Sequence, residues 1–198
     1  ASDIVQENSI IWVEGPSDRL YVLKWIEQIA PELKEGIHFS VMFYGGRLLS
    51  HLSGDSELVE DFINLKALNQ NSAIILDSDR PSKTARHNAT KKRVIGEFES
   101  TDGFAWLTLG REIENYLDAD DLHEALLKAH PNSYREKAVG GQFDNLLNFP
   151  VVGGGKTKTA DKVKVATLMT ATDLNLDILD LKKQLNGLAS FIKAANHL

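Results

Sequence analysis

Four short apolar runs, each followed by a turn, are spread over the first part of the chain. They cover residues 9–13 (SIIWV), 38–44 (HFSVMFY), 73–76 (AIIL) and 104–109 (FAWLTL). Apolar runs of this length that do not alternate with polar residues are typical of strands buried on both faces of a parallel sheet. The first two runs are separated by apolar residues at helical spacing, namely Leu20, Leu23, Ile26 and Ile29. The pattern therefore predicts an α/β unit with a parallel sheet flanked by helices.

The first helix is expected to follow Glu14-Gly15-Pro16, with Ser17 as its cap and Asp18 near its positive end. A second helix is expected over residues 58–68. Helical patterns also cover residues 120–129, 161–170 and 178–195, with a glycine-rich loop at 153–155. The tail alone has no obvious core. We therefore predict a core over residues 1–118 and a helical extension, 119–198, that completes the same domain.

Composition and charge narrow the function classes. The 198 residues include no cysteine, which excludes disulfides, zinc–thiolate sites and cysteine catalysis. No apolar run is long enough to span a bilayer and no signal-peptide pattern is present, so we expect a cytoplasmic protein without membrane contact. The net charge of -6 argues against a protein that coats nucleic acid by bulk electrostatics.

Two local basic stretches interrupt this acidic chain. The first runs from residue 80 to 93 without an acid, and the second runs from 156 to 164 with one. Such stretches are often solvated loops. Beside a metal site they would form a phosphate-binding surface, for which the candidates are Arg80, Lys83, Arg86, Lys91, Lys92, Arg93, Lys156 and Lys158.

Acidic residues follow three of the four predicted strands. Glu14 follows the first, Asp77 and Asp79 follow the third, and Glu112 and Glu114 lie just beyond the fourth. Ligands of parallel α/β sheets bind at the carboxyl ends of the strands, so these acids are expected to share one rim. Asp77 and Asp79 are two apart, and in an extended segment both would face one point. Asp18, in the first helical turn, could point back to the same rim.

Carboxylates gathered on one rim repel each other unless they hold cations or some are protonated. Oxygen ligands without His or Cys favour Mg²⁺ or Mn²⁺, and a pair of such ions can hydrolyse a phosphodiester. Each acid alone also fits a cap, a turn or a surface role. Those separate explanations do not predict that acids recur at strand ends.

The segments WVEGPSD (12–18) and ILDSD (75–79) resemble the Toprim fold of bacterial primases, topoisomerases and several nucleases. The resemblance is closer to one branch, the overcoming-lysogenization-defect (OLD) family of ATPase-linked nucleases. It rests further on Tyr44-Gly45-Gly46 and on REIENYL (111–117). It covers residues 9–117 well and the tail loosely.

The resemblance implies a metal-dependent endonuclease that nicks or cuts DNA with two Mg²⁺ or Mn²⁺ ions per site. It implies metal ligands at Glu14, Asp18, Asp77, Asp79 and one of Glu112 and Glu114. Glu114 is the preferred fifth acid, and the sequence does not decide. Glu14, Asp77 and Asp79 are also the expected catalytic acids. The expected catalytic lysine is Lys162, with Lys156 and Lys158 as open alternatives.

The resemblance also implies partners. OLD-type proteins carry an ATPase in front of this unit, so the chain is expected to be the C-terminal region of a longer protein, which could form a homodimer. A ribonuclease and a non-catalytic nucleic-acid-binding scaffold are the alternatives. A phosphoacceptor receiver domain fits poorly, because a Glu opens the acidic series and Asp-Ser-Asp ends the third strand.

Overall fold

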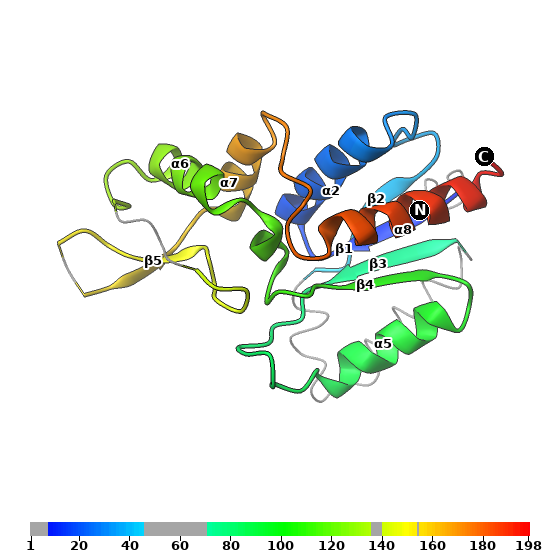
Figure 1. Cartoon of the computed structure of the whole chain (residues 1–198), viewed down its shortest axis with the longest axis horizontal. Helices are drawn as coiled ribbons and strands as arrows, with labels where there is room; N and C mark the ends of the chain where they lie inside the picture. The colour runs from blue at the N-terminus through cyan, green and yellow to red at the C-terminus, as the bar shows by residue number, and fades with distance from the viewer. Residues whose placement is uncertain (1–7, 46–70, 136–139, 154) are drawn as a thin grey trace.

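The computed structural model describes residues 8–45, 71–135, 140–153 and 155–198 (Figure 1). The helix expected over residues 58–68 and Gly46 of the Gly-Gly segment lie outside the described residues. Within the described ranges, no helix combines the length and apolar composition that would let it cross a membrane.

A four-stranded parallel sheet forms the centre of the molecule. Its strands are β1 (Ile10–Val13), β2 (Ser40–Phe43), β3 (Ser72–Leu76) and β4 (Phe104–Leu107), in the order β2-β1-β3-β4. In register, Ile11 pairs with Val41 on one side and with Ala73 on the other. The predicted α/β class and parallel sheet are confirmed.

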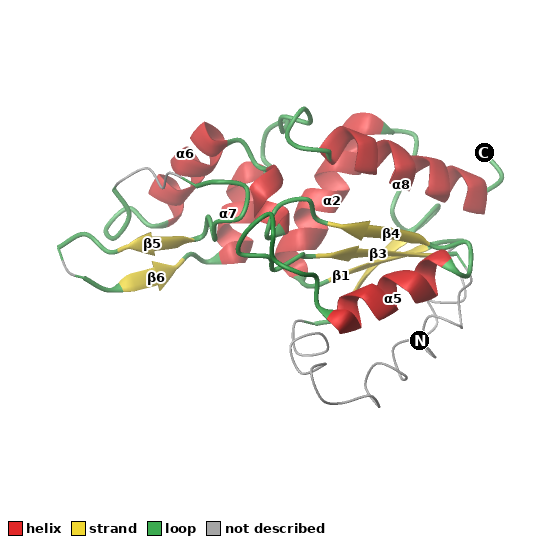
Figure 2. Cartoon of the chain, turned by 60° about the horizontal axis from the view of Figure 1, so that its bottom comes forward, coloured by secondary structure: helices red, strands yellow, loops and turns green. Residues whose placement is uncertain are grey.

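The two central strands are buried on both faces, which explains their uninterrupted apolar sequence. Ile11, Val13, Ala73 and Ile75 belong to the larger hydrophobic cluster, whereas Ile10, Trp12, Ile74 and Leu76 belong to a smaller one. Successive side chains of a strand point to opposite faces. Helices α2 (Pro16–Ile29) and α8 (Leu181–Ala195) lie on the first face, and α5 (Ala89–Glu99) lies on the second (Figure 2).

Helix α2 begins before the cap that the sequence predicted at Ser17. Gly15 is its N-cap and Pro16 its first residue, so Ser17 lies inside the helix and the expected Ser17 cap is wrong. Proline fits the first helical position because its missing N–H would be unpaired there and its φ is already helical. The Asp18 carboxylate accepts the N–H groups of Gly15 and Glu14, at 3.2 and 3.1 Å, and supplies the cap.

The C-terminal part packs onto the sheet unit. Helix α6 (Ala119–Ala129) contacts α7 (Lys162–Met169), α7 contacts α2, and α8 contacts α2 and β4. Leu126, Val165 and Leu188 share the larger cluster with the sheet residues. The division at residue 118 stays a prediction. An antiparallel hairpin, β5 (Asn148–Pro150) and β6 (Thr157–Thr159), was not expected and extends away from the sheet (Figures 1 and 2).

Candidate metal and phosphate site

The carboxyl ends of β3 and β4 point toward α7 (Figure 2). Segments that follow these strands and β1 carry the predicted acids. Glu14 directly follows β1, Asp77 directly follows β3, and Glu112 caps a short 3-10 helix, η1 (Ile113–Tyr116), beyond β4. Glu114 lies within η1. The acids expected at the strand ends therefore lie at one edge of the sheet.

Hydrogen bonds join the end of β3 to the segment beyond β4. The buried Asp77 accepts the Ile113 N–H through Oδ1 at 2.7 Å. The Ser78 hydroxyl donates to the Gly110 carbonyl at 2.5 Å, and the Ser78 N–H donates to Thr108 Oγ1 at 2.9 Å. These bonds fix the Asp77 carboxylate against the N-terminus of η1. The Asp-Ser-Asp segment is thus a structural junction as well as a candidate ligand set.

Asp79 departs from the extended geometry that the sequence suggested. Its φ is +54°, in the left-handed region, and its N–H donates to the Arg111 carbonyl at 2.9 Å. The Asp79 side chain is 64% exposed and pairs with Lys91, whereas Asp77 is buried. The expected extended geometry is wrong at Asp79, because the left-handed turn interrupts the alternation of an extended chain. That Asp77 and Asp79 serve one site stays a prediction.

The two glutamates beyond β4 have different surroundings. The Glu114 side chain is fully buried, and neither of its carboxylate oxygens has a hydrogen-bond partner among the described residues. Glu112 Oε1 accepts a bond from Asn145 Nδ2 at 2.9 Å, and its Oε2 has no such partner. An unpartnered buried carboxylate is costly. Of the two, Glu114 is therefore the one whose surroundings more strongly disfavour an ionised carboxylate without a counter-charge.

Of the three lysines considered for catalysis, Lys162 is the one that approaches Glu114. It is the first residue of α7, and its Nζ lies 3.6 Å from Glu114 Oε1. Its side chain is 41% exposed, so the ammonium can also be reached from solvent. Lys156 and Lys158 instead lie exposed at the β5–β6 hairpin, Lys158 within β6.

The acids shift each other's pKa. Burial raises the pKa of Asp77 well above its usual value, and the charges of Glu114, Asp18 and Glu14 raise it further. Burial also raises the pKa of Glu114 to about 7; Lys162 opposes this shift, while Asp18 and Glu112 add to it. Negative charges at this rim therefore lie close enough to oppose each other's ionisation.

The pKa of Lys162 shows the reverse effect. Burial disfavours its protonated form, but the summed attraction of the neighbouring acids, with Glu114 first and Glu112 next, leaves the pKa above its usual value. Lys162 is thus held as a cation. It offsets part of the negative charge of the rim.

Glu14 and Asp18 lie on the β1 side of the same rim. Burial raises the pKa of Glu14, and Asp18 raises it further. The Asp18 carboxylate accepts three hydrogen bonds, from the N–H groups of Glu14 and Gly15 and from the Ser17 hydroxyl at 3.1 Å. Asp18 thus has a structural role at the start of α2, whatever part it takes in binding a cation.

The donor chemistry fits a hard divalent cation. Every candidate ligand is a carboxylate, and unpartnered oxygens remain on Glu112 and Glu114. Within the ranges that the structure describes, however, no three Asp, Glu or His side chains converge closely enough to hold one ion between them. The residues present therefore suit Mg²⁺ or Mn²⁺ chemically, and an ion held by one or two of these carboxylates would take its remaining ligands from water or substrate.

Most of the predicted basic residues lie on the surface. The exposed ones are Lys83, Arg86, Lys92, Arg93, Lys156 and Lys158. Arg80 is half-buried, and its guanidinium lies 5.2 Å from the centre of the Phe143 ring. Lys91 does not fit the expected surface role. Its side chain is 7% exposed and faces the Asp77–Asp79 turn, so a nucleic acid could not contact it as the structure stands.

Two asparagines and a glycine near the site were not anticipated. Asn115 Oδ1 accepts the Glu112 N–H at 2.8 Å, and Asn115 Nδ2 donates to the Asp144 carbonyl at 3.1 Å. With Asn145, which binds Glu112, it ties residues 140–146 to η1. A Cβ on Gly110 would lie 2.5 Å from the Asn115 Cβ, so only glycine fits there. The sequence did contain one signal for this framework, the polar residue Asn115 directly after Ile113-Glu114.

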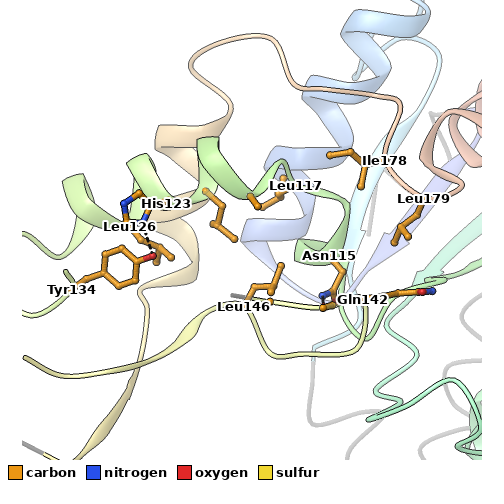
Figure 3. Close-up of a pocket in the computed structure, with 13 residues that line it drawn as sticks. Asn115, Leu117, His123, Leu126, Tyr134, Gln142, Leu146, Ile178 and Leu179 are labelled. Carbon is orange, nitrogen blue, oxygen red and sulfur yellow. Dashed lines mark hydrogen bonds between the residues drawn. The ribbon is translucent and has the colours of Figure 1, made fainter. Parts of the chain in front are cut away.

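A separate apolar cavity of about 160 Å³ lies beside η1 and α6 (Figure 3). Its lining includes Leu122, Leu126 and Ile178, and His123 Nδ1 lies 2.9 Å from the Tyr134 hydroxyl at its wall. Its lining contains no Asp, Glu, Lys or Arg. This cavity therefore lacks the charged groups of the acidic rim and is distinct from it.

In sequence, neither a protein-family model nor a curated protein matches the chain. Two solved structures resemble it in fold. Both are of the C-terminal region of the OLD protein of Xanthomonas campestris pv. campestris, one phased with iodine and the other with mercury. Each has a TM-score of 0.56 and 17% sequence identity, and each alignment covers 97% of this chain and 98% of the solved chain. The likeness extends over the helical tail, which the sequence resemblance covered only loosely.

Proposed function

We propose that the chain is a metal-dependent endonuclease unit that hydrolyses phosphodiester bonds of DNA with Mg²⁺ or Mn²⁺, two ions per site, as the C-terminal region of an OLD-like protein. One observation carries the proposal. Glu114 is fully buried, lacks a hydrogen-bond partner on either oxygen among the described residues, and lies 3.6 Å from Lys162 at the rim that also holds Asp77 and Glu14. The OLD-like fold supports it independently.

The electrostatics of the rim favour a bound cation. Ionised Asp77 and Glu114 each oppose the charge of the other, and burial opposes both. Lys162 supplies a single positive charge near these acids. A divalent cation would offset the remaining repulsion, which gives the acids a reason to lie together that separate structural roles do not.

The residues of the chain would divide the chemistry as follows. Asp77, oriented by the Ile113 N–H, and Glu114 would hold the ions together with Glu14, Asp79 and Glu112. When bound, divalent cations stabilise charge on phosphate oxygens and lower the pKa of a water. Lys162 would donate a hydrogen bond to a non-bridging phosphate oxygen and stabilise the charge that develops in the transition state. Water would be the nucleophile, and the phosphodiester would break to a phosphate and a hydroxyl end.

The basic residues would bind the backbone of the nucleic acid. Lys83, Arg86, Lys92 and Arg93 are exposed on the segment that follows the Asp-Ser-Asp turn, and Lys156 and Lys158 on the hairpin that precedes Lys162. Phosphate contacts of this kind bind DNA without reading its sequence. Because RNA has the same backbone charge, a ribonuclease is the alternative substrate choice.

Incubation with supercoiled plasmid tests the proposal. We expect nicking or linearisation with Mg²⁺ or Mn²⁺ and none with EDTA. Lys162→Met and Asp77→Asn should each lower the rate about 100-fold or more. The asparagine at position 77 retains an acceptor for the Ile113 N–H, so Asp77→Asn removes the charge and keeps this bond. Lys183→Met, at an exposed position of α8, is the matched control for loss of a lysine charge.

The outcomes separate the alternatives. Cleavage of RNA but not of plasmid would favour the ribonuclease. Metal-independent binding of DNA without cleavage would favour the non-catalytic scaffold. The proposal extends to a cytoplasmic, full-length protein with an ATPase domain before this unit, in which homodimerisation would take place. Activity seen only after that ATPase domain and ATP are supplied would support this extension.

A further inference from the structure

Lys91 is a buried lysine that the proposed chemistry does not use. It lies on α5, whose exposed neighbours Lys92 and Arg93 face away from the sheet. Lys91, Val94 and Phe98 are spaced three and four residues apart, so they share one face of the helix, and all three are buried. The helix therefore carries a lysine within the stripe that packs on the sheet.

Two oxygen acceptors at the end of β3 receive the Lys91 ammonium. Its Nζ donates to the Asp77 carbonyl at 2.5 Å and to Asp79 Oδ2 in a close ion pair. Burying an ammonium is costly unless it is paired and hydrogen-bonded, and here both conditions are met. The contact thus joins α5 to the Asp-Ser-Asp turn with a fixed positive charge.

The two lysines near the rim differ in access. Lys162 is 41% exposed and faces Glu114, so an incoming phosphate can reach it. Lys91 is 7% exposed and faces Asp79 from within the protein, where no phosphate can reach it. A cation in that position acts on the groups of the protein around it, the Asp79 carboxylate that it contacts first. It occupies one oxygen of an acid that the proposed function assigns to metal binding.

We propose that Lys91 is an internal counter-ion of the site, which neutralises Asp79 in the absence of a divalent cation and competes with that cation for the Asp79 carboxylate. The inference rests on the proposed function in that it takes Asp79 as a metal ligand. A positive charge beside a cation site lowers the affinity for the cation. Lys91 would therefore weaken metal binding while stabilising the turn when no metal is present.

The first test measures the coupling energy between Lys91 and Asp79 in the absence of a divalent metal. Urea unfolding in EDTA of the wild type, Lys91→Met, Asp79→Asn and the double variant forms a double-mutant cycle. We expect a favourable coupling between residues 91 and 79. A second cycle, with Lys92→Met in place of Lys91→Met, should show no coupling to residue 79. No coupling at 91 and 79 would overturn the inference without reference to any activity.

The second test measures Mn²⁺ binding, with free Mn²⁺ followed by electron paramagnetic resonance. Lys91→Met should bind Mn²⁺ about tenfold more tightly than the wild type, because it removes a charge in direct contact with a ligand. Lys91→Arg, which keeps the charge, should not bind more tightly. Lys92→Met, which removes an exposed charge of the same helix, should change the affinity much less.

The failures of the two proposals can be told apart. If the wild type binds Mn²⁺ and Lys91→Met binds it equally or more weakly, the counter-ion inference alone is overturned. If no variant binds Mn²⁺ or Mg²⁺, the metal site itself is refuted and the inference falls with it, even if the coupling in EDTA is present.

Discussion

Glu114 makes the stability of the protein depend on pH in a direction opposite to that of carboxylates whose pKa is lowered by a nearby positive charge. Its pKa is raised from 4.5 to about 7, with burial as the largest cause. Between these values the folded protein binds a proton that the unfolded chain has released. The contribution of Glu114 to the stability of the fold is therefore most favourable below about pH 4.5. It falls as the pH rises from there to about 7, and above pH 7 the full cost of burying the ionised carboxylate is present.

The magnitude follows from the shift. A change of roughly 2.5 pKa units corresponds to about 3 kcal/mol, at about 1.4 kcal/mol per unit. No discount for solvent screening applies, because the Glu114 side chain is fully buried. The attraction of Lys162 is already contained in the raised pKa. Glu114→Gln, which resembles the protonated acid, should therefore stabilise the protein at pH 8 by up to about 3 kcal/mol and change it little at pH 4.5.

Urea unfolding in EDTA at pH 4.5, 6, 7 and 8 measures this effect. The difference between Glu114→Gln and the wild type should grow with pH, and Glu124→Gln, at an exposed position of α6, should show no such trend. Saturating Mn²⁺ should remove most of the advantage at pH 8, since a bound cation offsets the charge. Parallel pH profiles for Glu114→Gln and the wild type would refute the reasoning, because they would mean that Glu114 ionises at no cost.

Two further predictions concern the framework of the site. Ser78→Ala removes the hydroxyl that donates to Gly110 at 2.5 Å, and should cost about 1 to 3 kcal/mol in urea unfolding; an unchanged midpoint would mean that the β3–β4 junction does not depend on it. Asn88→Ala removes the side chain that accepts the Thr90 N–H at 2.7 Å, and should cost about 1 kcal/mol, with Asn88→Asp close to the wild type. A larger loss for Asn88→Asp than for Asn88→Ala would contradict the capping role.

The strands and their terminal acids could be predicted because both depend on local sequence. Residues of β1 and β3 are apolar without interruption, which in a chain of this size occurs where both faces are covered. Parallel strands bring their carboxyl ends to one edge, so the proximity of Glu14, Asp77 and the segment around Glu114 followed from topology alone.

What the sequence could not predict depends on single backbone angles and on distant partners. The backbone at Asp79 turns into the left-handed region, and nothing in Asp-Ser-Asp specifies that angle. Helix α5 was missed because its fully buried apolar residues are Val94 and Phe98, with Ile95 partly buried and Lys91 completing the buried face. The β5–β6 hairpin was missed because β6, Thr157–Thr159, is exposed at every position and shows no alternation.

The placement of Lys162 on α7 has a consequence for biosynthesis. The acids at residues 14, 77 and 114 leave the ribosome well before this lysine, and α7 reaches the rim only by docking against α2 and α6. A nascent or truncated chain that lacks α7 would carry these acids with Lys91 beside Asp79 but without Lys162 beside Glu114. The rim therefore gains the charge of Lys162 only once the late helices have folded into place.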